Sequence, residues 1–163
     1  MPLLKNGEVI ADPWQHMAAG EAVPPTGPVV VPFERWKAER EVLLARNTPL
    51  GVRLPNAQNV GELAADLGRL ELIVLEFPKF VDGRAFSQAR VLRERYRYRG
   101  ELRATGDVLR DQLQFMQRCG FDAFEIAAPN AAEIWRAAVN EIDVFYQPAA
   151  DDRVPAPRLR RSA

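Results

Sequence analysis

From Thr48 onward the chain repeats one pattern four times: a short apolar run, a turn rich in Pro, Gly or Asn, and a segment with helical spacing of apolar residues. The apolar runs are Leu50 to Leu54, Leu72 to Phe77, Glu101 to Ala104 and Ala123 to Ala127. Strands that alternate with helices form parallel sheets, because right-handed crossovers carry the chain back to the same edge. We therefore predict an α/β fold with four consecutive βα units. Strand order is not readable, so a partial (β/α) barrel and an open three-layer sandwich both fit.

The N-terminal region predicts elements that precede these units. Asn6-Gly7 suits a type I′ turn, which indicates a hairpin over residues 2–11. Val29 to Val31 is long enough for one short edge strand, and the apolar spacing from Phe33 to Leu44 predicts a single amphipathic helix.

A chain of 163 residues suits one domain. We expect residues 1–47 to pack on a βα core formed by residues 48–147. Residues 148–163 contain three prolines, charged side chains and little apolar content, so we predict a disordered tail.

Charge and cysteine content exclude several classes of function. The 22 basic and 22 acidic side chains cancel, so no global charge favours nucleic acid or an acidic membrane. Cys119 is the only cysteine, which excludes an internal disulfide and any iron–sulfur or zinc site ligated by cysteines of this chain alone. No apolar run reaches the length of a membrane span, and we expect a cytoplasmic protein. Whether a non-covalent cofactor such as a flavin binds stays open.

In parallel α/β folds, ligands bind at the carboxyl ends of the strands. The predicted pocket is therefore built from the loops Pro55 to Asn59, Phe77 to Arg84, Ala104 to Gln112 and Ala127 to Asn130. Its polar side chains fall into candidates for anion binding and candidates for proton transfer. The anion-binding candidates are Lys79, Arg84, Ser87, Arg103, Thr105 and Gln112, and the proton-transfer candidates are Asp82, Asp107 and Asp111.

Arg103 lies on a predicted central strand, where both faces are usually apolar. Alternation places Glu101 and Arg103 on one side of the strand, and Glu76 on the neighbouring run is a possible partner for Arg103. Two interpretations are equally weighted: a buried ion pair that fixes strand register, and a guanidinium held ready for an oxyanion.

Residues 84–103 contain seven arginines against two acids. Arg90, Arg93, Arg95 and Arg97 cannot all share one helix face, so we interpret them as exposed helix surface and as candidates for docking a partner. Asp107 fits an ordinary helix N-cap, and the three aspartates match no metal-binding loop, so no metal is assigned. We expect His16, the only histidine, to lie in an N-terminal turn with no acid near it in the sequence and not to act as a general base.

Three segments resemble the bacterial family of unknown function DUF934. They are FPKFVDGRAFSQARVLRERY from Phe77 to Tyr96, GELRATGDVLRDQL from Gly100 to Leu113, and RCGFDAFE from Arg118 to Glu125. The chain departs from the wider family motif at Arg97, where a glycine is common; this position closes a helix, so the change concerns the local C-cap.

The resemblance implies an association with sulfate assimilation, because the family is described in general catalogues as a probable oxidoreductase involved in sulfite reduction. We therefore expect an accessory or electron-delivery partner that docks on a siroheme-containing sulfite reductase. The alternative is a small stand-alone enzyme, in which Arg84 and Arg103 orient a sulfur oxyanion or another anionic substrate and an aspartate exchanges a proton. The family offers no catalytic residues to carry over to this sequence.

Overall fold

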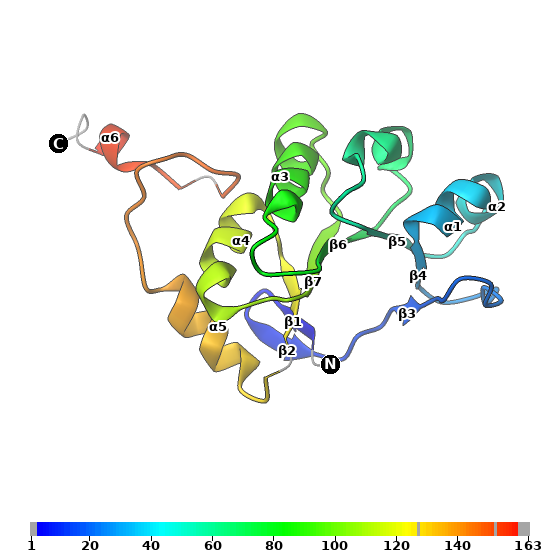
Figure 1. The fold of residues 1–163 in the computed structure, drawn as a ribbon, viewed down its shortest axis with the longest axis horizontal. Helices are drawn as coiled ribbons and strands as arrows, with labels where there is room; N and C mark the ends of the chain where they lie inside the picture. Colours follow the sequence, from blue (N-terminus) through cyan, green and yellow to red (C-terminus); the bar gives the residue numbers. More distant parts are fainter. Residues whose placement is uncertain (1–2, 127, 152, 160–163) are drawn as a thin grey trace.

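The computed structural model describes residues 3–126, 128–151 and 153–159, and this part of the chain forms one eight-stranded mixed sheet (Figure 1). The strands are β1 (Leu3–Lys5), β2 (Glu8–Ile10), β3 (Gln15–His16), β4 (Val29–Pro32), β5 (Leu50–Leu54), β6 (Leu72–Phe77), β7 (Glu101–Gly106) and β8 (Ala123–Glu125). Their order in the sheet is β2-β1-β8-β7-β6-β5-β4-β3. From β3 to β8 each strand pairs in parallel with the next one along the chain, whereas β1 is antiparallel to both β8 and β2.

The helical segments are α1 (Phe33–Ala38), α2 (Arg40–Leu44), η1 (Val60–Asp66), α3 (Arg84–Arg90), η2 (Val91–Arg95), η3 (Arg110–Gln112), α4 (Leu113–Cys119), α5 (Ala131–Val139) and α6 (Ala156–Leu159). Because the parallel strands follow chain order, each right-handed crossover returns on the same side of the sheet. The helices from α1 to α5 accordingly collect on one side, and the sheet curls into a half-barrel (Figure 1). The predicted α/β class is thus confirmed at the level of a mixed α/β fold, and the curl favours the partial barrel over the sandwich.

The predicted N-terminal hairpin is present. Asn6 and Gly7 have φ angles of 50° and 85°, as a type I′ turn requires. The hairpin does more than precede the core, because β1 pairs with β8 and extends the sheet by two strands.

Two predictions for the region before β5 are wrong. β4 is not an edge strand, since β3 pairs with its outer side. The single predicted helix is two helices, α1 and α2, because the backbone of Glu39 leaves the helical region at φ −112° and ψ 20°. After this break Arg40 makes a two-pronged ion pair with Asp66, with both N···O distances at 2.7 Å.

The helix starts also differ from expectation. Asn59 caps its helix by accepting a hydrogen bond from the Gly61 amide at 2.8 Å, and this helix, η1, is 3₁₀. Asp107 caps no helix, since η3 begins at Arg110 after a cap residue, Leu109, that makes no side-chain cap bond. Leu109 itself is exposed.

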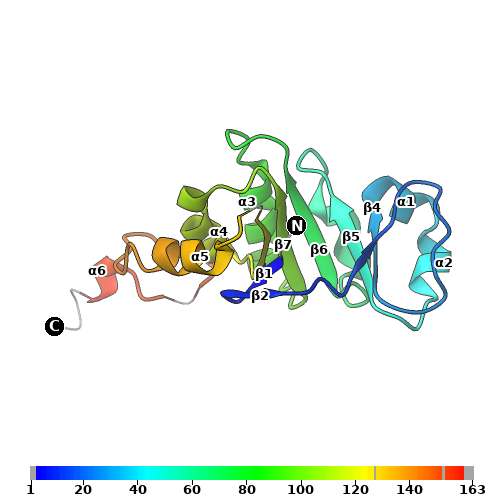
Figure 2. The ribbon, with the colours of Figure 1, turned by 90° about the horizontal axis from the view of Figure 1, so that it is seen from below.

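The two faces of the sheet have different chemistry. The face under the helices carries the main core, in which strand residues such as Ile73, Leu75 and Leu102 pack against helix residues such as Leu92 and Met116. The opposite face, which we call the open face, has a small apolar cluster of Val30, Leu72, Val74 and Trp14. The chain from β2 to β3 crosses this face (Figure 2). The polar side chains of this face come from Lys5, Arg53, Glu76, Glu101, Arg103, Thr105 and Glu125.

The prediction that residues 148–163 are disordered stays a prediction. Within residues 148–159, the Ala150 amide donates to the Arg118 carbonyl at 3.0 Å, Arg118 pairs with Asp151 at 2.9 Å, and α6 follows. Residue 2 of the predicted hairpin, Ala127 of the last predicted strand and loop, and residues 152 and 160–163 of the tail lie outside the described residues.

Candidate functional site

Arg103 is the centre of a polar cluster on the open face. Its side chain is 0% exposed, although it stands on that face of β7. Nε and Nη2 donate to Glu101 Oε1 at 3.0 and 2.9 Å, and Nη1 and Nη2 donate to Asp12 Oδ2 and Oδ1 at 2.7 and 3.2 Å. Glu125 Oε1 lies 3.5 Å from Nη1. The ion-pair interpretation of Arg103 is thus realised, with partners other than the predicted Glu76.

Further contacts extend the cluster to β8 and, beyond it, to β1. Lys5 Nζ donates to Glu101 Oε2 at 2.7 Å, so β1 is tied to β7. The Thr105 hydroxyl donates to Glu125 Oε2, which ties β7 to β8. The predicted partner Glu76 instead lies 4.0 Å from Arg53.

His16 joins the cluster through the chain segment that crosses the sheet. Nε2 lies 3.0 Å from Asp12 Oδ2, and Arg53 Nη2 lies 2.9 Å from Nδ1. An arginine only donates, so Nδ1 accepts and Nε2 carries the proton that it donates to Asp12. The expectation of no nearby acid is wrong: Asp12 is four residues before His16, and this spacing was the available sequence signal.

The pKa of Asp12 is lowered in this setting. Burial by itself would raise it, but the hydrogen bonds from Arg103, the Trp14 amide and His16 outweigh that effect. Asp12 is therefore held as a carboxylate that neutralises Arg103.

Asp12, His16 and Glu125 are also residue types that ligate divalent metals, and their ligand atoms lie within 4.8 Å of one another. Arg103 Nη1, however, contacts all three, at 2.7 Å from Asp12 Oδ2, 3.4 Å from His16 Nε2 and 3.5 Å from Glu125 Oε1. A permanent positive charge against all three groups repels a second cation. The cluster is therefore built to hold a guanidinium rather than a metal ion.

Two of the four predicted loops, Phe77 to Arg84 and Ala104 to Gln112, are joined by hydrogen bonds. Asp107 Oδ2 accepts from the Phe80 amide at 2.9 Å, and Gln112 Nε2 donates to the Phe80 carbonyl at 3.0 Å. Gly106, at φ 97°, packs against the Phe77 carbonyl so closely that a Cβ would collide with it. Gln88, which sequence reasoning missed, donates to the carbonyls of Pro55 and Gln58 and links the first loop to α3.

The two arginines of the predicted pocket do not come together. Arg84 makes a two-pronged pair with Asp82, Nε–Oδ1 2.9 Å and Nη2–Oδ2 2.6 Å, and Arg84 thereby lowers the pKa of Asp82. No contact among the described residues joins Arg84 to Arg103, which is enclosed on the open face. Lys79, Ser87 and Asp111 are exposed, and their side chains make no hydrogen bond or ion pair within the described part of the chain.

The helix arginines divide into structural and exposed side chains. Arg93 is structural, since it binds the carbonyls of Tyr98, Gly100 and Gly120 and the carboxylate of Asp122. The expectation that Arg93 lies on the exposed helix surface is thus wrong, because its donors bind groups within the fold. Arg90 pairs with Glu94 at 2.9 Å.

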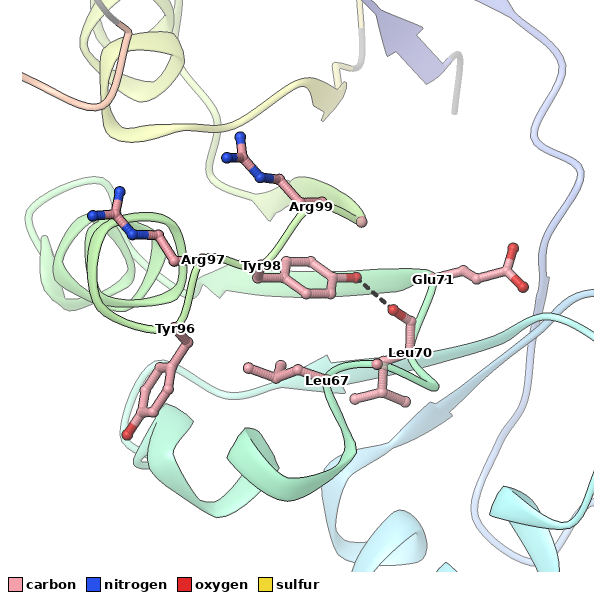
Figure 3. A pocket seen from close by; sticks show the side chains of 9 residues that line it. Leu67, Leu70, Glu71, Tyr96, Arg97, Tyr98 and Arg99 are labelled. Atoms are coloured by element: carbon pink, nitrogen blue, oxygen red, sulfur yellow. Dashed lines mark hydrogen bonds between the residues drawn. The ribbon is translucent and has the colours of Figure 1, made fainter.

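Three exposed arginines, Arg95, Arg97 and Arg99, form what we call the arginine edge. Arg97 and Arg99 line a depression of about 610 Å³ at the amino-terminal ends of β6 and β7, together with Leu67, Leu70, Tyr96 and Tyr98 (Figure 3). The Tyr98 hydroxyl donates to the Leu70 carbonyl at 3.1 Å, and this hydrogen bond joins two residues that line the depression. None of the three arginines forms an ion pair with a described residue, and Arg95 lies over the Tyr96 ring.

Arg97 has a φ angle of 55°, in the left-handed region that favours glycine. Replacing Arg97 by glycine is expected to raise the free energy of unfolding by about 0.5–1 kcal/mol, because the strain of a side chain at this φ is removed. Urea unfolding measures the change. Arg99→Gly is the control, since Arg99 lacks the positive φ and should gain nothing; an Arg97→Gly variant less stable than the original chain would contradict the explanation.

Cys119 has no signs of reactivity. It is buried as the last residue of α4, and burial raises its pKa to about 11. Within the described residues, no helix has the length and apolar character needed to cross a membrane.

The fold and the cluster define a class of protein. It is an α/β half-barrel in which Arg103 and carboxylates neutralise one another on the open face. Its amino-terminal edge carries arginines that form no ion pair with a described residue. The family model "Bacterial protein of unknown function (DUF934)" matches residues 51–156. The match covers more than half of the chain, which belongs to this family. A search of curated proteins finds no match.

Proposed function

We propose that this protein is an accessory partner in assimilatory sulfite reduction and docks on a siroheme-containing sulfite reductase through the arginine edge. The observation that carries the proposal is that Arg95, Arg97 and Arg99 are exposed and lack an ion pair among the described residues. Most other basic side chains near them are already neutralised: Arg90 by Glu94, Arg93 by Asp122, and Arg118 by Asp151. The family resemblance suggests the reductase as the partner, and the exposed arginines are the groups that would bind an acidic surface on it.

Unpaired arginines at one edge favour an acidic partner surface. Their field steers association and is weakened by salt, whereas paired charges contribute little at a distance. The depression beside Arg97 and Arg99 leaves room for a protruding acidic segment, and Tyr96 offers an aromatic face at its rim.

The geometry gives less support to a stand-alone enzyme that uses Arg84 and Arg103. Arg84 is paired with Asp82 through Nε and Nη2, and Arg103 is enclosed by Asp12, Glu101 and Glu125. No contact among the described residues brings the two guanidiniums to one pocket, and an anion could reach Arg103 only by displacing a carboxylate.

Binding to the purified sulfite reductase haemoprotein tests the proposal. We expect the full chain to bind with an affinity that falls as salt rises, and the triple variant R95Q/R97Q/R99Q to bind roughly ten- to a hundredfold more weakly. Calorimetric titration at two salt concentrations measures both effects.

The matched control is K37Q/R110Q/R136Q, which removes the same charge from exposed positions on α1, η3 and α5. It should bind like the original chain. Absence of binding by the original chain, or equal weakening by both triple variants, would rule out the arginine edge as the docking surface.

A further inference from the structure

Four large apolar side chains are exposed at the carboxyl edge of the sheet, at the end of β6 opposite the arginine edge. Their exposed fractions are 54% for Phe80, 71% for Val81, 38% for Leu109 and 52% for Phe115. They come from the segments Pro78–Gly83 and Asp107–Phe115, which hydrogen bonds bring together. We call these four residues the apolar edge. Scattered apolar side chains are ordinary on a surface, but four on two segments joined by hydrogen bonds, the second of which runs into α4, indicate a contact surface.

The backbone under the apolar edge is held firmly. Both backbone groups of Phe80 are bonded, its amide to Asp107 and its carbonyl to Gln112. The Asp82 amide donates to the Lys79 carbonyl at 3.0 Å, which closes a turn around Phe80 and Val81. Phe115 is supported from behind by the Phe86 ring, with centroids 4.9 Å apart. A surface ordered before contact loses little entropy on binding.

The charges beside the apolar edge show what kind of surface fits it. Asp82 is paired with Arg84 and Arg110 with Glu141, and Asp107 accepts a hydrogen bond from the Phe80 amide. Lys79 and Asp111 are the two that lack a partner among the described residues. The edge thus combines an apolar centre with one free cation and one free anion.

We propose that a second copy of this chain covers the apolar edge in a two-fold symmetric dimer. In such an interface each contact occurs twice, so Lys79 of each copy meets Asp111 of the other and both free charges are paired. The apolar side chains of the two copies then bury one another. A membrane surface fits less well, because one cation and one anion leave no positive excess for anionic lipids. The dimer does not depend on the proposed function, and it leaves both arginine edges pointing outward.

Sedimentation equilibrium of the full chain, at concentrations from micromolar to about a hundred micromolar, tests the dimer. We expect the F80S/V81S variant to dissociate roughly a hundredfold more readily, because two apolar anchors are lost from each copy. V42S is the control, since Val42 is 73% exposed on α2, far from this edge in the chain, and should leave the dimer unchanged.

Exchange of the two charges tests the symmetry. K79D and D111K alone should each weaken the dimer, because like charges then face each other, and the K79D/D111K exchange should restore it. Circular dichroism confirms that each variant is folded. A monomer throughout the concentration range, a dimer that survives F80S/V81S, or an exchange variant no better than the single ones overturns the proposal.

Discussion

Arg103→Leu is expected to lower the free energy of unfolding by about 3–5 kcal/mol, the usual loss when one partner is removed from a buried ion pair. The leucine leaves Asp12, Glu101 and Glu125 without their shared guanidinium. The contacts that remain are Lys5 with Glu101, His16 with Asp12 and Thr105 with Glu125. Urea unfolding at neutral pH measures the loss. Arg90→Leu is the control, because the exposed Arg90–Glu94 pair contributes at most about 0.5 kcal/mol.

The loss should depend on pH in a definite direction. In the original chain the pKa of Asp12 is lowered, so its stabilisation is present above the unfolded pKa, about 3.9, and disappears as pH falls through the folded pKa. Without Arg103 the neighbouring carboxylates oppose ionisation of Asp12, so the variant lacks the stabilisation that the original chain gains as pH rises through the folded pKa of Asp12. The difference between the two proteins is therefore larger at pH 7 than at pH 4. A loss below about 1 kcal/mol at pH 7, or one that grows on acidification, would show that Arg103 is not held by these carboxylates.

The class of fold was predictable because it depends on local patterns. Alternating apolar runs and helical segments indicate βα repeats whatever the contacts between them, and Asn6-Gly7 defines a hairpin turn by its own conformational preference. The attachment of β1 to β8 was not predictable, because it joins residues such as Leu4 and Phe124 that are far apart in the chain.

The cluster around Arg103 was predicted only in part, for the same reason. Strand alternation placed Glu101 beside Arg103, since that depends on neighbours in one strand. Asp12 and His16 reach Arg103 only because the segment between β2 and β3 crosses the open face. The sequence spacing of Asp12 and His16 indicates that they can meet, but not where in the fold.

The orientation of the arginines around η2 was equally hard to predict from the sequence. The run of arginines looks uniform in sequence, yet Arg93 is half-buried and bonded to three carbonyls, while Arg97 is exposed in a left-handed conformation. Which arginine turns inward depends on the π-helical segment η2, whose wider turn shifts the residues that follow Val91 relative to an α-helix.

Arg93→Leu should lower the free energy of unfolding by about 2–4 kcal/mol, although the notion of a surface arginine would predict almost no effect. Arg93 Nη1 donates to the carbonyls of Tyr98 and Gly100 at 2.7 and 2.9 Å, Nε donates to the Gly120 carbonyl at 3.0 Å, and Nη2 pairs with Asp122 at 2.9 Å. The Arg93 side chain is 16% exposed, so water replaces these bonds poorly. Thermal and urea unfolding measure the loss, and Arg99→Leu, which removes an exposed arginine, is the matched control.

Asp122 makes the effect of Arg93→Leu dependent on pH. Burial raises the pKa of Asp122, while Arg93 and the Leu102 amide hold it down. Removing Arg93 raises this pKa further, and a group with a raised folded pKa contributes stability at low pH that is lost as pH rises through that pKa. The Arg93→Leu deficit should therefore be larger at pH 7 than at pH 4, whereas Arg99→Leu should show no such trend. If Arg93→Leu and Arg99→Leu lowered the free energy of unfolding equally, Arg93 would behave as an exposed arginine and would again be a candidate for the docking surface.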